Sequence, residues 1–207
     1  ASQSKIPDEV IISDDCSNDN TIKLIKQFAK SAPFRVEIYQ NETNLGYAQN
    51  FNNALSKTNG DLIFLSDQDD VWFNSKVKDI CNMAASSKSL LIMNNAEITD
   101  SDMIPTGINK LDQIRLLDGD DSKFVMGCCA AIKRELLDLA LPIDINFPAH
   151  DTWISWLAQF MNLKEITPEV MQYYRRHGNN ESNYLGNSIS EISKVDTFFS
   201  RIKNLML

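Results

Sequence analysis

The stretch from Leu62 to Trp72 constrains this chain more than any other. Its first four residues, Leu-Ile-Phe-Leu, have the composition of a buried β-strand, and carboxylates follow at Asp67, Asp69 and Asp70. Acids at the end of a buried strand repel one another and lose hydration, so a fold keeps them there only when a cation or strong donors compensate. We therefore expect a metal or phosphate site at this turn.

The elements around this stretch alternate. Strands are predicted at 9–13, 34–40, 62–65 and 90–93, and helices at 22–29, 48–55 and 77–84. This order predicts an α/β fold with a mostly parallel sheet, helices on both faces and a ligand site at the carboxyl ends of the strands. Asp14 and Asp15 follow the first strand as Asp67 follows the third, so both acidic turns should share one rim. Alternatively, Asp14 and Asp15 only cap the next helix.

The second half is less regular. Residues 99–123 lose all periodicity, which favours either a functional lid or an irregular but ordered segment with a short helix. Two short strands are predicted at 163–166 and 170–174, the first preceded by an apolar helix that begins near Asp151. Residues 188–207 place apolar side chains along one helical stripe, which suits either packing on the chain's own domain or contact with a membrane surface.

Composition narrows the possible partners. With 207 residues, 43% of them hydrophobic, the chain suits one globular domain. A formal net charge of −8 argues against a nucleic-acid partner, which needs a phosphate-neutralising surface. The four cysteines show no disulfide or zinc spacing, which favours a reducing compartment. No apolar run approaches the roughly 20 residues that span a bilayer.

Sequence context separates one Asp-x-Asp pair from the others. The spacing also occurs at 100–102 and 118–120, but only Asp67 and Asp69 follow a buried strand. Carboxylate oxygens at such a place suit Mg²⁺ or Mn²⁺, which bind substrate phosphates as well as protein oxygens. The chain contains no P-loop, dinucleotide-binding, esterase or zinc-protease motif.

Two other places leave alternatives open. Gly127, followed by Cys128 and Cys129, would let a ligand approach the backbone, but core packing explains the two thiols equally well. Asp151 stands at the start of a predicted helix, where it serves either as a capping acid or as a catalytic carboxylate.

Five blocks of sequence together resemble the family 2 glycosyltransferases, and more narrowly their bacterial rhamnosyltransferase-like branch. The blocks are Asp-Glu-Val-Ile-Ile-Ser-Asp-Asp-Cys-Ser-Asn-Asp-Asn-Thr (8–21), Asn-Leu-Gly-Tyr-Ala-Gln-Asn-Phe (44–51), Ser-Asp-Gln-Asp-Asp-Val-Trp (66–72), His-Asp (150–151) and Tyr-Arg-Arg-His-Gly-Asn-Asn (174–180). The resemblance implies the GT-A fold, a mostly parallel Rossmann-like sheet flanked by helices.

The resemblance also implies roles for residues. Those of the nucleotide-sugar donor site are Asp14 and Asp15 at the base and ribose, Asn44 and Gly46 near the nucleotide, and Arg176 beside phosphate. Asp67 and Asp69 match the pair that holds Mg²⁺ or Mn²⁺ against the diphosphate, and His177 matches a position that reaches the metal or diphosphate. Asp151 corresponds to the general base that deprotonates the acceptor hydroxyl. Asp70 is expected to brace the turn rather than to bind metal.

The chain departs from the family pattern at its start. Members open with a further apolar strand, and residues 1–4 resemble only the tail of the helix that follows it, so we expect an N-terminally truncated GT-A domain over 1–187 and an amphipathic helix over 188–207. One hypothesis is an inverting transferase that moves sugar from a nucleotide-diphosphate sugar to a saccharide or lipid-linked acceptor. It would build surface polysaccharide on the cytoplasmic side of a bacterial membrane. The other is a non-catalytic relative that binds sugar nucleotide or a partner.

Overall fold

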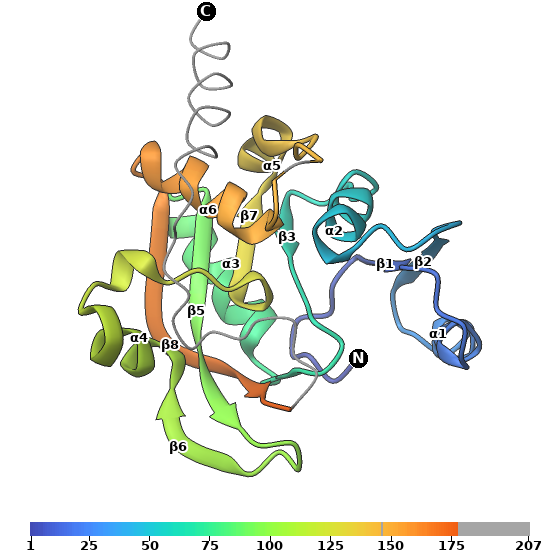
Figure 1. Ribbon diagram of the computed structural model, residues 1–207, viewed down its shortest axis with the longest axis horizontal. Helices are drawn as coiled ribbons and strands as arrows, with labels where there is room; N and C mark the ends of the chain where they lie inside the picture. Colours follow the sequence, from blue (N-terminus) through green and yellow to red (C-terminus); the bar gives the residue numbers. More distant parts are fainter. Residues whose placement is uncertain (146, 178–207) are drawn as a thin grey trace, which may run out of the picture. The chain divides into compact units, whose positions relative to one another are not determined.

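The computed structural model describes residues 1–145 and 147–177, and Figure 1 shows how their elements are arranged. The chain divides into two units, Ala1–Arg176 and His177–Leu207, and the helices and strands that the structure describes belong to the first. Its strands are β1 (Glu9–Asp14), β2 (Arg35–Gln40), β3 (Leu62–Phe64), β4 (Val71–Trp72), β5 (Leu91–Thr99), β6 (Pro105–Asn109), β7 (Ala130–Lys133) and β8 (Lys164–Arg175). Its helices are α1 (Thr21–Ala29), α2 (Tyr47–Leu55), α3 (Lys76–Ser86), α4 (Lys110–Asp118), α5 (Arg134–Ala140) and α6 (His150–Phe160), with short 3₁₀ turns at Asp121–Lys123 and Gly127–Cys129.

The larger sheet is mixed, which corrects the expectation of a mostly parallel one. Its strands lie in the order β3-β7-β5-β8-β4, and β6 pairs with β5 beside this path. Within it only β5 and β8 run parallel, while the β3–β7, β5–β7, β5–β6 and β4–β8 pairs are antiparallel. Strand direction depends on the connections between strands, and residues 99–123 carried too little pattern to reveal them.

The first two strands form a separate parallel sheet, with β1 paired to β2 along its whole length. No strand of the described residues pairs with both β1 and β3, so the two acidic turns do not lie on one continuous sheet as predicted. Helix α2 links the two regions, because it contacts β1 on one side and α6 on the other.

Both faces of the larger sheet are covered, as the sequence indicated. Consecutive residues of a strand point to opposite faces, and Leu91, Ile92 and Met93 of β5 are each about 1% exposed. Helix α3 covers one face, where Ile80 and Ala84 pack with residues of β5, β7 and β8. Helices α5 and α6 contact β7 and β8.

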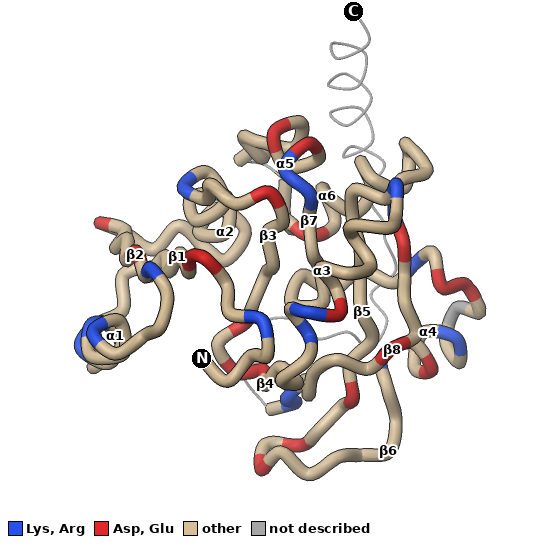
Figure 2. Tube along the Cα trace, turned by 180° about the vertical axis from the view of Figure 1, so that it is seen from behind, with Lys and Arg blue, Asp and Glu red and all other residues tan. Residues whose placement is uncertain are grey.

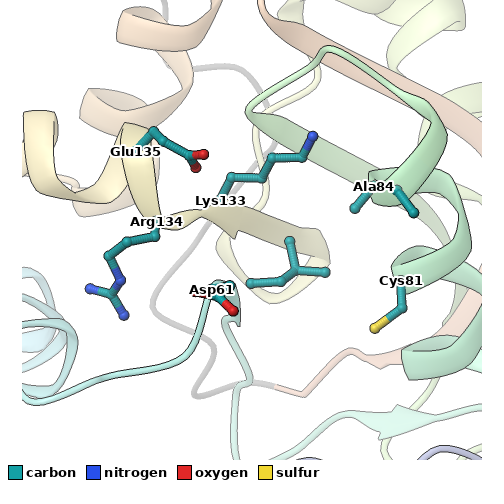
Figure 3. Close-up of a pocket in the computed structure, with 8 residues that line it drawn as sticks. Asp61, Cys81, Ala84, Lys133, Arg134 and Glu135 are labelled. Carbon is teal, nitrogen blue, oxygen red and sulfur yellow. The ribbon is translucent and has the colours of Figure 1, made fainter.

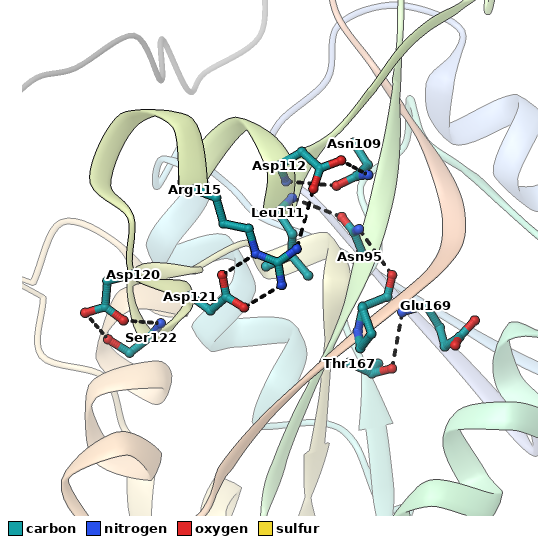
Figure 4. A network of polar contacts seen from close by, with 11 residues as sticks. Asn95, Asn109, Leu111, Asp112, Arg115, Asp120, Asp121, Ser122, Thr167 and Glu169 are labelled. Atoms are coloured by element: carbon teal, nitrogen blue, oxygen red, sulfur yellow. Dashed lines mark hydrogen bonds and ion pairs between the residues drawn. The ribbon is translucent and has the colours of Figure 1, made fainter.

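Strand β5 continues through Asn94 and Asn95, where the sequence predicted that it would end. Both side chains are buried, which is costly without hydrogen bonds, and most of their polar atoms have partners. The Asn95 amide donates to the Pro168 carbonyl at 3.2 Å, and its oxygen accepts from the backbone amide of Leu111 at 3.1 Å. Asn95 therefore anchors α4 and the segment near Pro168 of β8 to the middle of the sheet (Figure 4).

Residues 99–123 are ordered, which supports the second of the two interpretations. They form the β5–β6 hairpin, helix α4 and a 3₁₀ turn. The Asn109 side chain caps α4 by accepting from the Asp112 amide, and Arg115 donates to both carboxylate oxygens of Asp121 at 2.7 Å (Figure 4). Local polar contacts of this kind leave no apolar periodicity in the sequence.

Two predictions concern the end of the chain. The two strands expected at 163–166 and 170–174 form one strand, β8, whose register against β5 shifts near Asn95. The helix expected at 188–207, and with it the domain boundary near 187, lies outside the described residues. Among the helices that are described, none is long and apolar enough to cross a bilayer.

Candidate active site

The acidic turn, which carries Asp67, Asp69 and Asp70, lies between β3 and β4. Figure 2 shows acidic residues in red close to β4. Burial, followed by the charges of Asp70 and Asp69 and then of Asp151, raises the pKa of Asp67 to about 7. Asp151 comes from helix α6, more than 80 positions away in the sequence. The fold therefore brings together the carboxylates that the sequence assigned to metal binding and to proton abstraction.

Asp70 fastens this turn to strand β8. One of its oxygens accepts from Gln172 Nε2 at 2.9 Å, and the other accepts from the backbone amide of Arg175 at 3.2 Å. The Cys128 Sγ lies within 4.8 Å of a carboxylate oxygen of Asp70. Because each oxygen of Asp70 already accepts from strand β8, its bracing role agrees with the sequence-based expectation.

A buried lysine, Lys76, contacts residues that hold the acidic turn. Lys76 is 1% exposed, and its ammonium donates to the Cys128 carbonyl at 3.0 Å and to Gln172 Oε1. The ammonium also lies 4.2 Å from the centroid of the Trp72 ring. Burial lowers the pKa of Lys76, and the charges of the nearby acids oppose this effect. Lys76, Gln172 and Asp70 thus form one chain of hydrogen bonds beneath the acidic turn.

Sequence reasoning missed Lys76 and Gln172. A signal for Lys76 was present, since it stands four residues before Ile80 on the apolar stripe of α3. A lysine at such a position is buried and needs acceptors or a negative charge nearby. Gln172 offered no comparable signal, because its partner Asp70 is 102 positions away.

The chemistry of the turn suits an oxygen-binding cation. Ligand atoms of Asp67, Asp70 and Cys128 lie within 4.8 Å of one another. Hydrogen bonding to Cys129 and burial raise the pKa of the Cys128 thiol well above its usual value, so it remains protonated and is a poor ligand. The carboxylates, including the adjacent Asp69, are the better donors for Mg²⁺ or Mn²⁺. This grouping contains Asp70 in place of the predicted Asp69, whose place as a ligand stays a prediction.

Asp151 is held at the start of α6 by two backbone amides. Thr152 donates to its Oδ1 at 2.7 Å, and Gly127 donates to its Oδ2 at 3.0 Å. A Cβ on Gly127 would lie 3.6 Å from that Oδ2 and only 3.1 Å from His150 Nε2. Glycine at 127 thus allows the segment before β7 to approach α6. Asp151 does bond to its own helix, as the capping alternative requires, but its charge also reaches Asp67.

The expected nucleotide-binding residues form a group around the end of β1. The Asp15 carboxylate accepts from the backbone amides of Leu45 and Gly46 at 2.8 and 2.9 Å. Asn44 donates to the Asp15 carbonyl at 3.4 Å, and Gly46, with φ of 78°, adopts a conformation that favours glycine. Asp14 is buried and accepts from the Ser17 amide. The structure thus joins Asp15, Asn44 and Gly46, and shows that Asp15 shapes the turn before α2.

The two remaining predicted residues lie at the end of β8. The Arg176 backbone amide donates to the Thr99 carbonyl at 2.9 Å. Burial of Lys110 lowers the pKa of that lysine, and the positive charge of Arg176 lowers it further. Arg176 follows directly on Arg175, whose amide binds Asp70. His177 belongs to the second unit, so its contact with a metal or diphosphate stays a prediction.

A separate pocket of about 490 Å³ lies at the opposite end of β3 from the acidic turn (Figure 3). It is lined by Asp61, Cys81, Lys133, Arg134 and four neighbours. Lys133 donates to the Ser87 carbonyl, and Arg134 donates to the Gly60 carbonyl, so both cations already have structural roles. We do not place the active site there.

Comparisons with known proteins identify the class. The structure resembles that of Staphylococcus aureus TarS in complex with UDP, with a TM-score of 0.67 and 20% identity over 84% of this chain and 54% of that one. It also resembles the mannosyltransferase PcManGT of Pyrobaculum calidifontis in complex with GDP-Man and Mn²⁺, with a TM-score of 0.67 and 18% identity over 86% and 51%. The fold is therefore of the GT-A type.

The family follows from the sequence. The model of glycosyl transferase family 2 matches residues 1–140, and the chain belongs to this family. It is 29% identical over 198 residues to the dTDP-rhamnosyl transferase RfbG of Shigella flexneri, and 28% identical over 195 residues to an uncharacterised glycosyltransferase of Nostoc sp.. These matches cover 86% and 88% of this chain, which spans 66% and 60% of the two relatives.

The raised pKa of Asp67 predicts a stability effect in metal-free protein. With a folded pKa of about 7 and a reference value of 3.8, the folded state binds more protons than the unfolded state between these values. Its stability should therefore fall as pH rises through this window. Asp67→Asn removes the effect, so thermal unfolding should show a higher Tm for the variant at pH 8 and a smaller difference at pH 5.

Asp61→Asn is the matched control, because Asp61 is exposed at the other end of β3. It should change Tm little at either pH. An equal gain for Asp67→Asn at pH 5 and pH 8 would contradict the assignment.

Proposed function

We propose that this protein is an inverting glycosyltransferase that moves a sugar from a nucleotide-diphosphate sugar to a saccharide or lipid-linked acceptor in bacterial surface polysaccharide synthesis. The observation that carries the proposal is that Asp67 and Asp70 lie within 4.8 Å of Cys128 Sγ while Asp151 accepts from the adjacent Gly127 amide, which places these carboxylates around one short segment. Membership of family 2 and the likeness to RfbG support it. Work on the cytoplasmic side of the membrane, with peripheral contact to it, is part of the same proposal.

The donor would lie between the acidic turn and the turn before α2. Asp67 and Asp69 would hold Mg²⁺ or Mn²⁺, which when bound stabilises the diphosphate leaving group as a Lewis acid. Asp15, through its bonds to Leu45 and Gly46, fixes the turn near the nucleotide. Arg176 would pair with phosphate, for which a guanidinium is well suited. UDP, UDP-GlcNAc and GDP-Man in complexes of the structural neighbours support a nucleotide-sugar donor.

Asp151 would take the proton from the acceptor hydroxyl. Its Oδ2 is oriented by the Gly127 amide and its Oδ1 by the Thr152 amide, so the carboxylate has a defined direction before substrate binds. The acceptor oxygen then attacks the sugar carbon from the side opposite the diphosphate, and the configuration at that carbon is inverted. The base and the diphosphate site must therefore lie close together, which the charge of Asp151 acting on Asp67 supports.

Calorimetry tests the donor site. UDP, dTDP and GDP should be titrated into the protein with and without Mn²⁺, and at least one should bind more tightly with Mn²⁺. Asp67→Asn should remove this increase because it removes a charged ligand, whereas Asp61→Asn should keep it. If no nucleotide shows metal-dependent binding to the wild type, the enzymatic proposal fails and the non-catalytic alternative is favoured.

Asp151→Asn tests the base separately. The change keeps the size of the side chain and one acceptor oxygen but removes its charge and its basicity. We expect sugar transfer to fall by about 10²- to 10⁴-fold, while the dissociation constant of the nucleotide–Mn²⁺ complex stays the same. Measuring both quantities on one preparation is decisive, since unchanged transfer would remove Asp151 from the role of base.

A further inference from the structure

His150 is a buried histidine for which the proposed mechanism has no use. It is the first residue of α6 and the neighbour of Asp151, and its side chain is only 4% exposed. Among the described residues, neither Nδ1 nor Nε2 has a hydrogen-bond partner. Leaving a buried polar group unpaired destabilises the folded state, and most buried polar groups in proteins are paired. The arrangement therefore calls for a functional explanation.

Aromatic contacts hold the imidazole ring in place. It stacks on Phe51 with the ring centroids 4.0 Å apart and an interplanar angle of 16°. Tyr47 meets it edge-on at 6.0 Å, and the Tyr47 hydroxyl donates to the Pro148 carbonyl at 2.6 Å. Phe51 and Tyr47 both belong to α2, the helix that begins at the Asp15-bound turn. His150 thus lies between the expected nucleotide side of the site and Asp151.

One ring nitrogen faces the same place as the proposed base. A Cβ on Gly127 would lie 3.1 Å from His150 Nε2 and 3.6 Å from Asp151 Oδ2. Both atoms therefore lie next to the place that a side chain at position 127 would occupy. In this arrangement both ring nitrogens are covered. Contact with a ligand therefore requires a rotation of the ring or a shift of the short 3₁₀ turn that Gly127 begins.

The protonation state of the ring narrows the chemistry. Burial lowers the pKa of His150, and the negative charge of Asp151 opposes this effect more weakly. A neutral imidazole has one N–H donor and one nitrogen acceptor. A hydroxyl group is both donor and acceptor, so it complements either nitrogen. An ionised phosphate or carboxylate only accepts hydrogen bonds, so it could pair with the N–H of the ring but not with the acceptor nitrogen.

We propose that His150 binds a hydroxyl group of a sugar held beside Asp151, a specificity role that rests on the proposed function above. The hydroxyl belongs either to the sugar of the donor or to the acceptor. Its bond to His150 replaces the hydrogen bond that the buried ring lacks. The unpaired nitrogens of His150 thus lower the stability of the folded protein and leave the ring able to bind a ligand, a trade-off that is common in binding sites.

His150→Phe separates recognition from packing, because it keeps a ring against Phe51 and removes both nitrogens. His150→Gln keeps a hydrogen-bonding group near the position of Nε2, and His150→Leu serves as the apolar variant if phenylalanine proves too large. We expect the apolar variant to have a Tm equal to or above that of the wild type, and its kcat/KM for transfer to fall about 10-fold or more. His150→Gln should retain more activity than the apolar variant.

Binding and transfer measurements on the apolar variant show whether the hydroxyl belongs to the donor or to the acceptor. Affinities for UDP and UDP-GlcNAc, or for the nucleotide and sugar pair that the wild type prefers, are measured with Mn²⁺. A donor hydroxyl predicts weaker binding of the nucleotide sugar with unchanged binding of the nucleotide. An acceptor hydroxyl predicts unchanged binding of both and unchanged hydrolysis of the donor by water, with transfer alone reduced.

The proposal is overturned if an apolar variant at position 150 transfers sugar as well as the wild type does. It is also overturned if the loss of activity merely follows a loss of folded protein, as judged by circular dichroism, and His150→Gln is no better. Failure of the proposed function itself is distinguishable, because in that case the wild type would bind no nucleotide with Mn²⁺ and transfer no sugar.

Discussion

The hydrogen bonds of Asp70 are the interaction on which the site depends. A short turn that carries three carboxylates repels itself, and Asp70 resists this repulsion by accepting from Gln172 and from the Arg175 amide. The Lys76 side chain donates to Gln172 Oε1 and to the Cys128 carbonyl. Because these residues come from β8, α3 and the segment before β7, the observed form of the acidic turn depends on the assembly of the larger sheet.

The same segment before β7 connects the acidic turn to helix α6. The Cys128 Sγ lies within 4.8 Å of an Asp70 carboxylate oxygen, the Cys128 carbonyl accepts from Lys76, and its neighbour Gly127 donates to Asp151. The acidic turn and Asp151 are therefore both in contact with adjacent residues of one short 3₁₀ turn. Helix α2 begins at the turn bound by Asp15 and packs against His150 through Phe51.

The sequence predicted helices α1, α2, α3 and α6 and the strands β1, β2, β3, β5 and β8, because apolar periodicity reports which face of an element is buried. The resemblance to a family assigned Asp15, Asn44 and Gly46 to one donor site, and hydrogen bonds bring these three residues together, while their binding of a nucleotide stays a prediction. The prediction from sequence misjudged strand direction, which connections decide, and it ended β5 at Asn94, whose polar side chain is buried rather than exposed. Long-range pairs such as Gln172 with Asp70 leave no local trace in a single sequence.

The central claim is that the acidic turn holds a divalent cation against a sugar-nucleotide diphosphate. A crystal structure of the protein with Mn²⁺ and UDP, in which the anomalous signal locates manganese, tests this most directly. We expect one manganese peak at about 2.0–2.3 Å from carboxylate oxygens of the 67–70 turn, next to the diphosphate. UDP bound elsewhere, or manganese bound away from this turn, would contradict it.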